Sequence, residues 1–387
     1  MDATLFTENA TGTLVRISYP YSDYSFIPSA LPPEWELSVE DWQVLSDAKQ
    51  VLGELNGIGR YLPNPELLLK PLQQREALRS SSLEGTYATP AQLLLFELEG
   101  ERGRQRTGAA NPWREVSNYG RALREGWAAL TQGRPLSLFL IKELHAWLLE
   151  GVRGRDKRPG EWRMGQVCIG VDRRFVPPPH DRLQDCLIPF ENAIQESPSS
   201  IDPLVYAYMA HYQFEAIHPF VDGNGRVGRL LLALMTARSC RLRLPWLYMS
   251  AYFERHKDEY IDRLFNVSAR GEWAEWIRFC ITGTIEQAQD TIRRCDLLVQ
   301  LRNDMQQRVS SGSGRLHSIV EDLLVAPVLT IPMVRDRFGV TYPTAKSDVD
   351  RLIETGILRV IERTSRPKAY YAPQIFRVAY EDLDQAY

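Results

Sequence analysis

The sequence lacks the features that mark membrane proteins, secreted proteins and metal-cluster proteins. No apolar run approaches the roughly 20 residues that a membrane span needs, and the first stretch, MDATLFTENATGTLVRISYP, has no signal-peptide core. The five cysteines are odd in number and widely spread, and they show no CxxC or other metal-ligand spacing. These absences predict a cytoplasmic protein with no membrane partner.

Charge of one sign is not in excess either. The 387 residues include 46 basic and 49 acidic side chains, and the formal net charge is -3. The protein as a whole therefore has no field that favours nucleic acid or an anionic membrane, and any charged site must be local. With 44% hydrophobic residues, the chain is long enough for a large core and more than one domain.

Helical periodicity is present nearly everywhere. The segment SVEDWQVLSDAKQVLGELNG begins with Ser38 as an N-cap, repeats apolar residues at three and four residue steps, and ends at Gly57. Similar patterns occur in PELLLKPLQQREALRSSS, PAQLLLFELEG, WREVSNYGRALREGWAAL and LSLFLIKELHAWLLEG. The fold is therefore predicted to be mainly α-helical.

The segment QVCIGVDRRFVPPPH is an exception to this periodicity. Val167, Ile169 and Val171 alternate before a turn at 172–174, and Phe175 follows the turn. This pattern predicts a short β-hairpin, although it also fits an ordinary solvent-exposed hairpin without a function.

The composition changes near residue 310. The stretch VSSGSG is typical of a flexible linker, and three shorter helical patterns follow it, two of them with Thr330 and Thr341 as caps. The segment LRVIERTSRPKAYYAP then alternates like a two-stranded wing. Residues 315–387 are therefore predicted to form a winged helix-turn-helix domain.

The stretch IHPFVDGNGRVGRLLLALM combines a histidine, an acid, glycines and arginines. Pro219 ends the preceding helix close to His218, and the glycines of DGNGR let backbone N–H groups converge where a new helix starts with RVGRLL. Arg226 and Arg229 lie on one face of the first turns of that helix. This arrangement predicts a cradle for a polyphosphate.

Two further residues of this stretch suggest a chemical role. A carboxylate at Asp222 is unfavourable beside phosphates unless a cation lies between them, and Mg²⁺ bound by one carboxylate and phosphates meets that need. His218 has the one side chain there whose ordinary pKa lies near neutrality, so it is the natural general base.

Other interpretations of the stretch are weaker. Gly223, Gly225 and Gly228 match GxGxxG, but a dinucleotide fold needs a strand before the motif, and a helical pattern precedes this one. The Walker A pattern is absent. His211 and His218 are roughly 10 Å apart along a helix, too far to share a zinc ion easily, so His211 is predicted to be a packed core residue. A glycine-rich helix break with surface arginines stays open as a purely structural alternative.

The stretch HPFVDGNGRVGR resembles the HxFx(D/E)GNGRxxR motif of Fic domain proteins. LLLKPLQQREALRSSSLEGTYATPAQLL resembles the N-terminal segment of that family, and SAYFERHKDEYIDRL resembles the helices after its core. The resemblance implies a Fic-fold helical bundle with a β-hairpin flap. It also implies an N-terminal region at 1–105, a catalytic core at 106–308 and the winged helix at 315–387.

The resemblance implies a protein adenylyltransferase that uses ATP and Mg²⁺. His218 would deprotonate a Ser, Thr or Tyr hydroxyl of a target protein, or of this chain itself, for attack on the α-phosphate, and Asp222 would ligate the metal. Tyr260 would line the adenine pocket, although a core tyrosine fits it almost equally well. The implied nucleotide-binding residues are Asp222, Gly223, Asn224, Gly225, Arg226, Val227, Gly228, Arg229 and Tyr260. The implied target-docking flap comprises Val167, Ile169, Gly170 and Val171. Family members are often dimers, so the resemblance also implies a homodimer.

The same resemblance implies a function for the stretch SSSLEGT. Taken alone, it is a helix end in which Glu84 is a solvated acid or a cap. Ser80, Glu84 and Gly85 also resemble the family's inhibitory motif (S/T)xxxE(G/N). A carboxylate paired with Arg229 would occupy the guanidinium that the γ-phosphate needs. The same glutamate could serve in AMP removal, which the sequence leaves open.

The alternative function is that of a DNA-binding regulator whose Fic domain senses a nucleotide. Lys346 and Arg351 on the third helix, with Arg363, Arg366 and Lys368 in the wing, would contact DNA. Against this alternative, residues 315–387 contain ten basic and ten acidic side chains. The strong positive footprint of a DNA-binding domain is therefore missing.

Overall fold

The computed structural model describes residues 1–61, 66–90, 92–93, 98, 112–152, 158–196, 198–361 and 367–382. Most of the predicted helix PAQLLLFELEG, the boundary at 105 and 106, and the wing residues Arg363 and Arg366 lie outside these residues. The fold is mainly α-helical, as the sequence predicts. None of the described helices combines the length and hydropathy that a bilayer span requires.

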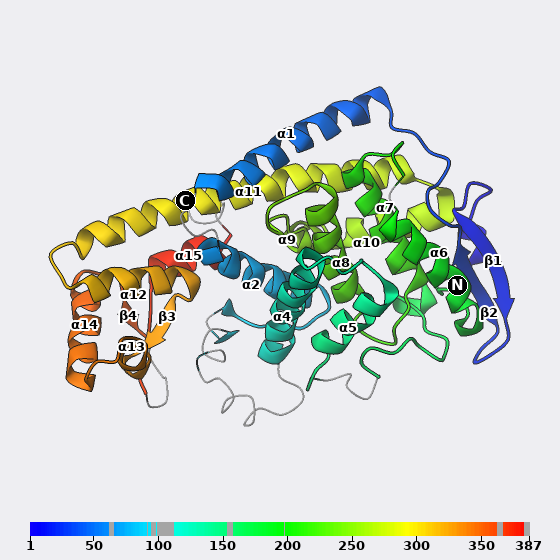
Figure 1. The fold of residues 1–387 in the computed structure, drawn as a ribbon. Helices are drawn as coiled ribbons and strands as arrows, with labels where there is room; N and C mark the ends of the chain where they lie inside the picture. The colour runs from blue at the N-terminus through cyan, green and yellow to red at the C-terminus, as the bar shows by residue number, and fades with distance from the viewer. Residues whose placement is uncertain are drawn as a thin grey trace.

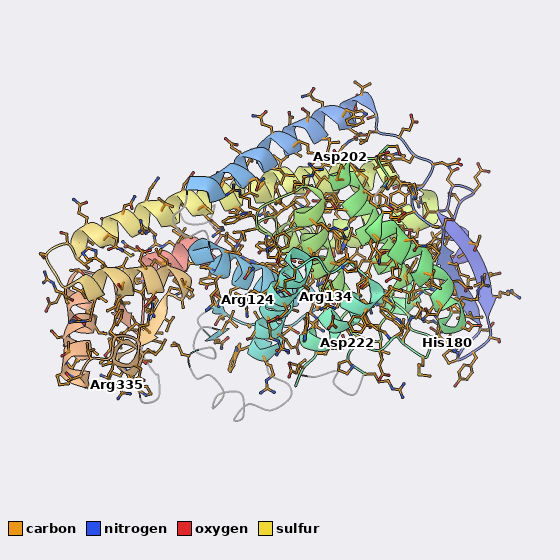
Figure 2. The ribbon with its side chains drawn as sticks, in the orientation of Figure 1. Arg124, Arg134, His180, Asp202, Asp222 and Arg335 are labelled. Carbon is orange, nitrogen blue, oxygen red and sulfur yellow. The ribbon has the colours of Figure 1, made fainter. Side chains whose placement is uncertain are left out.

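A helical bundle forms the centre of the molecule (Figure 1). Helix α7 crosses it, and nearly all of its residues are buried against α8, α6 and the surrounding helices. Figure 2 shows Asp202, just before the start of α7, and Asp222, in the loop between α7 and α8, on opposite sides of the bundle. The bundle helices are α4 (Pro112–Thr131), α5 (Leu138–Leu148), α6 (Leu183–Gln195), α7 (Pro203–Ile217), α8 (Asn224–Ser239), α9 (Ser250–Arg255) and α10 (Lys257–Arg270).

Two long helices lie along one edge of the bundle (Figure 1). Helix α11 (Trp273–Arg308) extends from the bundle to the C-terminal part of the chain, and α1 (Val39–Tyr61) packs along it. The N-cap of α1 is the predicted Ser38, whose Oγ accepts a hydrogen bond from the Asp41 amide at 3.1 Å. Helix α2 (Glu66–Leu83) contacts α4, α8 and α9 of the bundle as well as helices near the C-terminus.

An N-terminal β-hairpin was not expected from the sequence. Strands β1 (Gly12–Ile17) and β2 (Asp23–Pro28) pair antiparallel, from Gly12 opposite Pro28 to Ile17 opposite Asp23. Phe26 of β2 is fully buried and its amide donates to the Val176 carbonyl at 2.8 Å. The hairpin therefore supports the segment that follows the predicted flap.

The C-terminal part of the chain contains three helices followed by two strands of a hairpin, as the sequence predicts, with an additional strand between the first two helices. The assignment of these elements to a winged helix-turn-helix stays a prediction. The three strands form an antiparallel sheet in the order β3–β5–β4. The predicted caps are present, because Thr330 accepts from the Met333 amide and Thr341 from the Thr344 amide, both at 3.4 Å. The elements are α12 (Gly314–Val325), β3 (Val328–Thr330), α13 (Ile331–Phe338), α14 (Tyr342–Glu354), β4 (Arg359–Val360) and β5 (Ala369–Tyr371).

The stretch VSSGSG is a tight turn, and the prediction of a flexible linker is wrong. Hydrogen bonds from the Ser310 amide to Gln307 and from the Gly312 amide to Val309 fold the chain back. Helix α12 consequently packs against α11 and α2. A last helix, α15 (Pro373–Tyr380), which the sequence did not predict, also packs against α11 and α2.

Candidate active site

His218 lies at the point where α7 ends. Asp202 caps the start of this helix, since its side chain accepts from the Leu204 amide at 2.8 Å. At the other end His218 takes the left-handed conformation, with φ of 49°, and its amide donates to the Phe214 carbonyl at 3.0 Å. Pro219 has no amide hydrogen, so the helix cannot continue. The chain turns here and presents the imidazole to a cavity.

The side chain of His218 is set up to accept a proton. Its Nδ1 lies 3.3 Å from the Glu215 carbonyl, which can only accept, so Nδ1 carries the hydrogen and Nε2 keeps a lone pair. Burial, assisted by the nearby Arg163 guanidinium, lowers the pKa of His218 to about 4. The imidazole is therefore neutral at physiological pH.

Arg163 holds this turn in place, although no sequence motif indicates this role. Its Nε donates to the His218 carbonyl at 2.9 Å, and its backbone amide donates to the Pro219 carbonyl at 2.9 Å. The same guanidinium reaches the carbonyls of Gly165 and Pro178, on either side of the predicted flap. Burial lowers the pKa of Arg163 to about 10, so it stays charged. It joins the His218 turn to the base of the flap.

The loop after His218 leads into the N-terminus of α8. Gly223 is the N-cap with φ of 82°, a conformation that favours glycine, and α8 begins at Asn224, two residues earlier than the sequence suggested. The Asn224 side chain pairs with both backbone groups of Phe220, at 2.8 and 2.9 Å. It closes the loop, so the backbone amides at the start of α8 are the groups left to meet an anion.

His145 supports the same loop from α5 and was also missed. Its Nδ1 accepts from the Gly160 amide at 2.8 Å, so its Nε2 carries the hydrogen that meets the Asp222 carbonyl at 2.9 Å. The ring stacks on Phe220 at a centroid distance of 3.7 Å. Burial lowers the pKa of His145 to about 4, which keeps it neutral in this role.

Arg226 and Arg229 are both buried, each with 4% of its surface exposed. Arg226 donates from Nη1 to Glu115 of α4 at 2.9 Å, and its Nη2 lies 3.5 Å from the Asp222 carboxylate. Glu115 also accepts from the Thr86 hydroxyl at 3.0 Å. This pairing fixes the Arg226 guanidinium beside the loop, a role for Glu115 that the sequence did not reveal.

Arg229 contacts the stretch that resembles the inhibitory motif. Its Nε donates to the Ser80 hydroxyl at 2.8 Å, and its Nη2 donates to the Ser80 carbonyl at 2.9 Å and to Glu84 Oε1 at 2.8 Å. Burial alone would raise the pKa of Glu84, but the Arg229 guanidinium lowers it below its ordinary value. The two residues therefore form an ion pair at neutral pH.

Two glycines of α8 are needed for close approach. A Cβ at Gly225 would lie 2.2 Å from Glu84 Oε1, and a Cβ at Gly228 would lie 2.2 Å from Glu215 Oε1. These glycines therefore let two carboxylates reach the surface of α8. Helix α7, and no strand, precedes them, which is inconsistent with a dinucleotide-binding GxGxxG motif.

A cavity of about 220 Å³ brings several of the predicted residues together. His218, Gly225, Arg229, Tyr260 and Glu84 line it, and Ile169 and Gly170 of the flap close one side. The other lining residues are Leu83, Arg174, Phe175, Tyr212, Glu215, Ala216, Lys257, Ile261, Leu264, Phe265 and Ser268. The remaining predicted residues lie outside this lining: Val167, Val171, Ser80, Gly85, Asp222, Gly223, Asn224, Arg226, Val227 and Gly228.

The predicted flap is a minimal hairpin beside the cavity. Ile169 and Phe175 exchange both backbone hydrogen bonds, at 2.8 and 3.1 Å, around a short turn. Gly170 has φ of 78°, and Val171 at the tip is 84% exposed. An exposed edge of this kind can pair with an extended peptide.

Tyr260, which lines the cavity, forms a buried pair with His211. The His211 Nδ1 meets the Gly228 carbonyl at 3.1 Å, and its Nε2 meets the Tyr260 hydroxyl at 2.8 Å. Burial lowers the pKa of His211 to about 3, as fits the predicted core histidine. Glu215 lies close by, and its buried Oε1 has no hydrogen-bond partner among the described residues.

Among the residues that the structure describes, side chains alone do not build a metal cage. In the described part of the chain, no group of three or more His, Cys, Asp or Glu residues could hold an ion. Asp222 nevertheless has a side chain that is 44% exposed at the loop, with only a weak contact to Arg226. A single accessible carboxylate fits Mg²⁺ that takes its other ligands from phosphates and water.

The chain is similar to known proteins over two of its regions. Residues 42–128 match the Fic/DOC family N-terminal domain, and residues 135–236 match the Fic/DOC family domain. The chain is 30% identical over 206 residues to "Protein adenylyltransferase Fic" of Drosophila virilis and 31% identical over 205 residues to its Drosophila willistoni counterpart. These matches cover 49% and 50% of this chain but only 40% and 38% of the relatives.

Solved structures show the same fold. A Fic family protein from Desulfovibrio desulfuricans G20 superposes with a TM-score of 0.56 at 18% identity, covering 88% of this chain and 98% of the other. Residues 134–508 of Fic-1 from C. elegans superpose with a TM-score of 0.53 at 22% identity, covering 66% and 72%.

Proposed function

This chain is a Fic domain protein, and from that premise we propose that it is a protein adenylyltransferase that moves AMP from ATP to a hydroxyl of a target protein. The observation that carries the proposal is the convergence of three groups on one cavity. These groups are the neutral imidazole of His218, the amide-rich start of α8 and the guanidinium of Arg229. The names of the Drosophila relatives support the same reaction class.

In the proposed reaction, the target hydroxyl oxygen attacks the α-phosphorus of ATP. The bond from that phosphorus to the oxygen bridging to the β-phosphate breaks, pyrophosphate leaves, and the hydroxyl proton goes to Nε2 of His218. The charge of a bound triphosphate raises the pKa of the imidazole from about 4 towards the range where a base works well. The product is a phosphodiester between AMP and the target.

The residues around His218 bind and orient the nucleotide. The backbone amides at Asn224 and Gly225, at the positive end of α8, would bind phosphate oxygens, and Arg229 would bind the γ-phosphate. Asp222 would hold Mg²⁺, which neutralises phosphate charge when bound. The outer edge of the flap would pair with the target chain, because the amide and carbonyl of Ile169 are already bonded to Phe175 on the inner side.

Glu84 is proposed to inhibit this reaction. Its carboxylate takes the Arg229 Nη2 that the γ-phosphate would need, at 2.8 Å. ATP can then bind only after the ion pair opens, or in a pose that is not aligned for attack. A role of Glu84 in AMP removal belongs to the same proposal, since its carboxylate lines the same cavity as His218 and could orient water there.

The proposed C-terminal module comprises residues 315–387. Its charges give little support to the alternative that the protein binds DNA. Lys346 pairs with Asp350 at 2.6 Å, and Arg351 pairs with Glu354 at 3.2 Å, so two of the predicted DNA contacts are neutralised on α14 itself. A homodimer and a cytoplasmic location stay predictions from the sequence.

The experiment that tests the proposal compares Glu84→Gly with the double variant Glu84→Gly/His218→Ala. Each purified protein is incubated with ATP, Mg²⁺ and a cell lysate, and modified chains are found by mass spectrometry. We expect AMP adducts on hydroxyl side chains with the first variant and none with the second. Calorimetry should show that the double variant still binds ATP, because the imidazole removes a proton and is not needed to hold phosphate. Adducts with both variants would refute the assignment of His218.

A further inference from the structure

Helix α2 and the turn that follows it carry two neighbouring rows of functional side chains. Ser80, near the end of α2, and Glu84, in the turn directly after Leu83, form the first row, and Arg75 and Arg79, four residues apart on α2, form the second. The first row ends in the contacts with Arg229 in the cavity. The second row faces the C-terminal end of the chain. Because Glu84 directly follows α2, a movement of α2 displaces both rows together.

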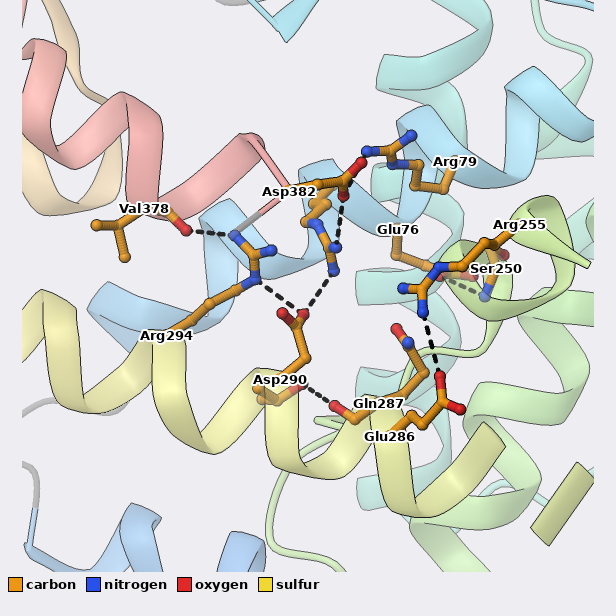
Figure 3. A network of polar contacts seen from close by, with 12 residues as sticks. Glu76, Arg79, Ser250, Arg255, Glu286, Gln287, Asp290, Arg294, Val378 and Asp382 are labelled. Carbon is orange, nitrogen blue, oxygen red and sulfur yellow. Dashed lines mark hydrogen bonds and ion pairs between the residues drawn. The ribbon is translucent and has the colours of Figure 1, made fainter. Parts of the chain in front are cut away.

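A single carboxylate near the C-terminus binds the second row. Asp382 Oδ1 accepts from Arg79 Nη2 at 2.8 Å and from Arg75 Nη2 at 3.4 Å. Arg75 also reaches Asp290 of α11 at 2.9 Å, and Arg79 reaches Glu254 of α9 at 3.0 Å. Figure 3 shows Asp382 above α11 with its carboxylate directed at Arg79. Asp382 is thus bonded to the helix that Glu84 directly follows.

Helix α15 holds Asp382 in this position. The Tyr380 hydroxyl donates to Gln74 of α2, and Arg294 of α11 donates to the Val378 carbonyl (Figure 3). Arg294 is itself fixed by Asp290 at 2.9 Å. The buried face of α15, which includes Ile375, packs against α11 and α2. Asp382 therefore follows an anchored helix.

We propose that Asp382 and Arg79 are positioning residues for Glu84, through which the C-terminal module holds α2 in the inhibitory position. This inference rests on the proposed function. It goes beyond it because it assigns the C-terminal module a part in the reaction that needs no DNA. A partner that draws α15 away from α2 would then raise transfer.

The position of α2 depends on contacts from two sides. On the bundle side, Glu76 accepts from the Tyr119 hydroxyl at 2.9 Å and from the Ser250 amide at 3.2 Å. On the other side are the contacts to Asp382 and α15. Loss of the Asp382 contacts leaves the bundle-side contacts intact. It therefore lowers the fraction of molecules that have α2 in the inhibitory position, without unfolding the helix. Partly exposed ion pairs contribute little, so we expect a moderate effect.

The test uses the full chain, four single variants and one double variant. Asp382→Asn removes the charge, and Asp382→Glu keeps it. Asp336→Asn is the matched control, because Asp336 lies in the same module and pairs with Arg335 of its own helix. We expect AMP transfer by Asp382→Asn to rise about fivefold over wild type, which corresponds to ~1 kcal/mol. Asp382→Glu and the control should stay at the wild-type rate.

The fourth variant, Glu84→Gly, separates a positioning role from a general structural one. Adding Asp382→Asn to Glu84→Gly should give no further increase, because the inhibitory group is already gone. A further increase in that background would overturn the proposal. If Glu84→Gly transfers AMP while Asp382→Asn stays at the wild-type rate, the positioning role alone is refuted. If Glu84→Gly makes no AMP adduct at all, the proposed function fails and this inference fails with it.

Discussion

Replacement of Glu84 by glycine should make the protein a faster adenylyltransferase. The substitution removes the bond from Glu84 Oε1 to Arg229 Nη2 at 2.8 Å and leaves the two bonds from Arg229 to Ser80. A charge-assisted hydrogen bond contributes about 1.5–3 kcal/mol, which corresponds to about 10–150-fold in rate. The Glu84 side chain is 38% exposed, so solvent weakens the pair and the lower end of this range is expected.

The assay for this prediction measures AMP incorporation from ATP labelled at the α-phosphate, at saturating ATP and Mg²⁺. Glu84→Gln is the informative companion, because it keeps the size of the side chain and removes its charge. If the ion pair is the inhibitory element, Glu84→Gln should recover most of the gain of Glu84→Gly. Equal incorporation by the wild type and Glu84→Gly would refute the inhibitory role of this contact.

Three other predictions follow from the site. Asp222→Asn should weaken the dependence of ATP binding on Mg²⁺, measured by calorimetry with and without the metal; an unchanged dependence would place the metal elsewhere. Arg226→Met should lower the free energy of unfolding by about 3–5 kcal/mol in urea titrations, because it breaks the buried ion pair between Arg226 and Glu115 at 2.9 Å, and a loss below 1 kcal/mol would contradict this. Burial raises the pKa of Glu215 from its ordinary value of 4.5 to about 8, so the acid favours folding at low pH and this contribution is lost as the pH rises towards 8. Glu215→Gln should therefore gain stability over wild type between pH 5 and pH 8, and parallel stability curves would count against the raised pKa.

The sequence predicts those parts of the site that are local in the chain. His218, the glycines and Arg229 lie within a dozen residues, where helix-breaking and helix-starting signals fix their relative placement. The supporting residues come from far away. The Arg163 bond to His218 spans 55 residues, and the Glu115 bond to Arg226 spans 111. Local patterns contain no information on such contacts, because tertiary packing creates them.

The errors in the predicted fold have a similar origin. The turn VSSGSG has the composition of a flexible linker, yet packing of α12 against α11 and α2 fixes its conformation. Strands β1 and β2 are short, and burial of residues such as Phe26 against the bundle stabilises them. Helix α15 is likewise held by its contacts with α11 and α2. In each case tertiary contacts decided a structure that composition alone left ambiguous.

The most direct test of the proposed reaction is a crystal structure of Glu84→Gly with Mg²⁺ and a non-hydrolysable ATP analogue. The proposal predicts that the triphosphate lies over the first turn of α8, with its γ-phosphate on Arg229 and Nε2 of His218 facing the side of the α-phosphorus opposite the leaving pyrophosphate. A triphosphate bound away from α8, or an imidazole directed away from the α-phosphorus, would contradict it.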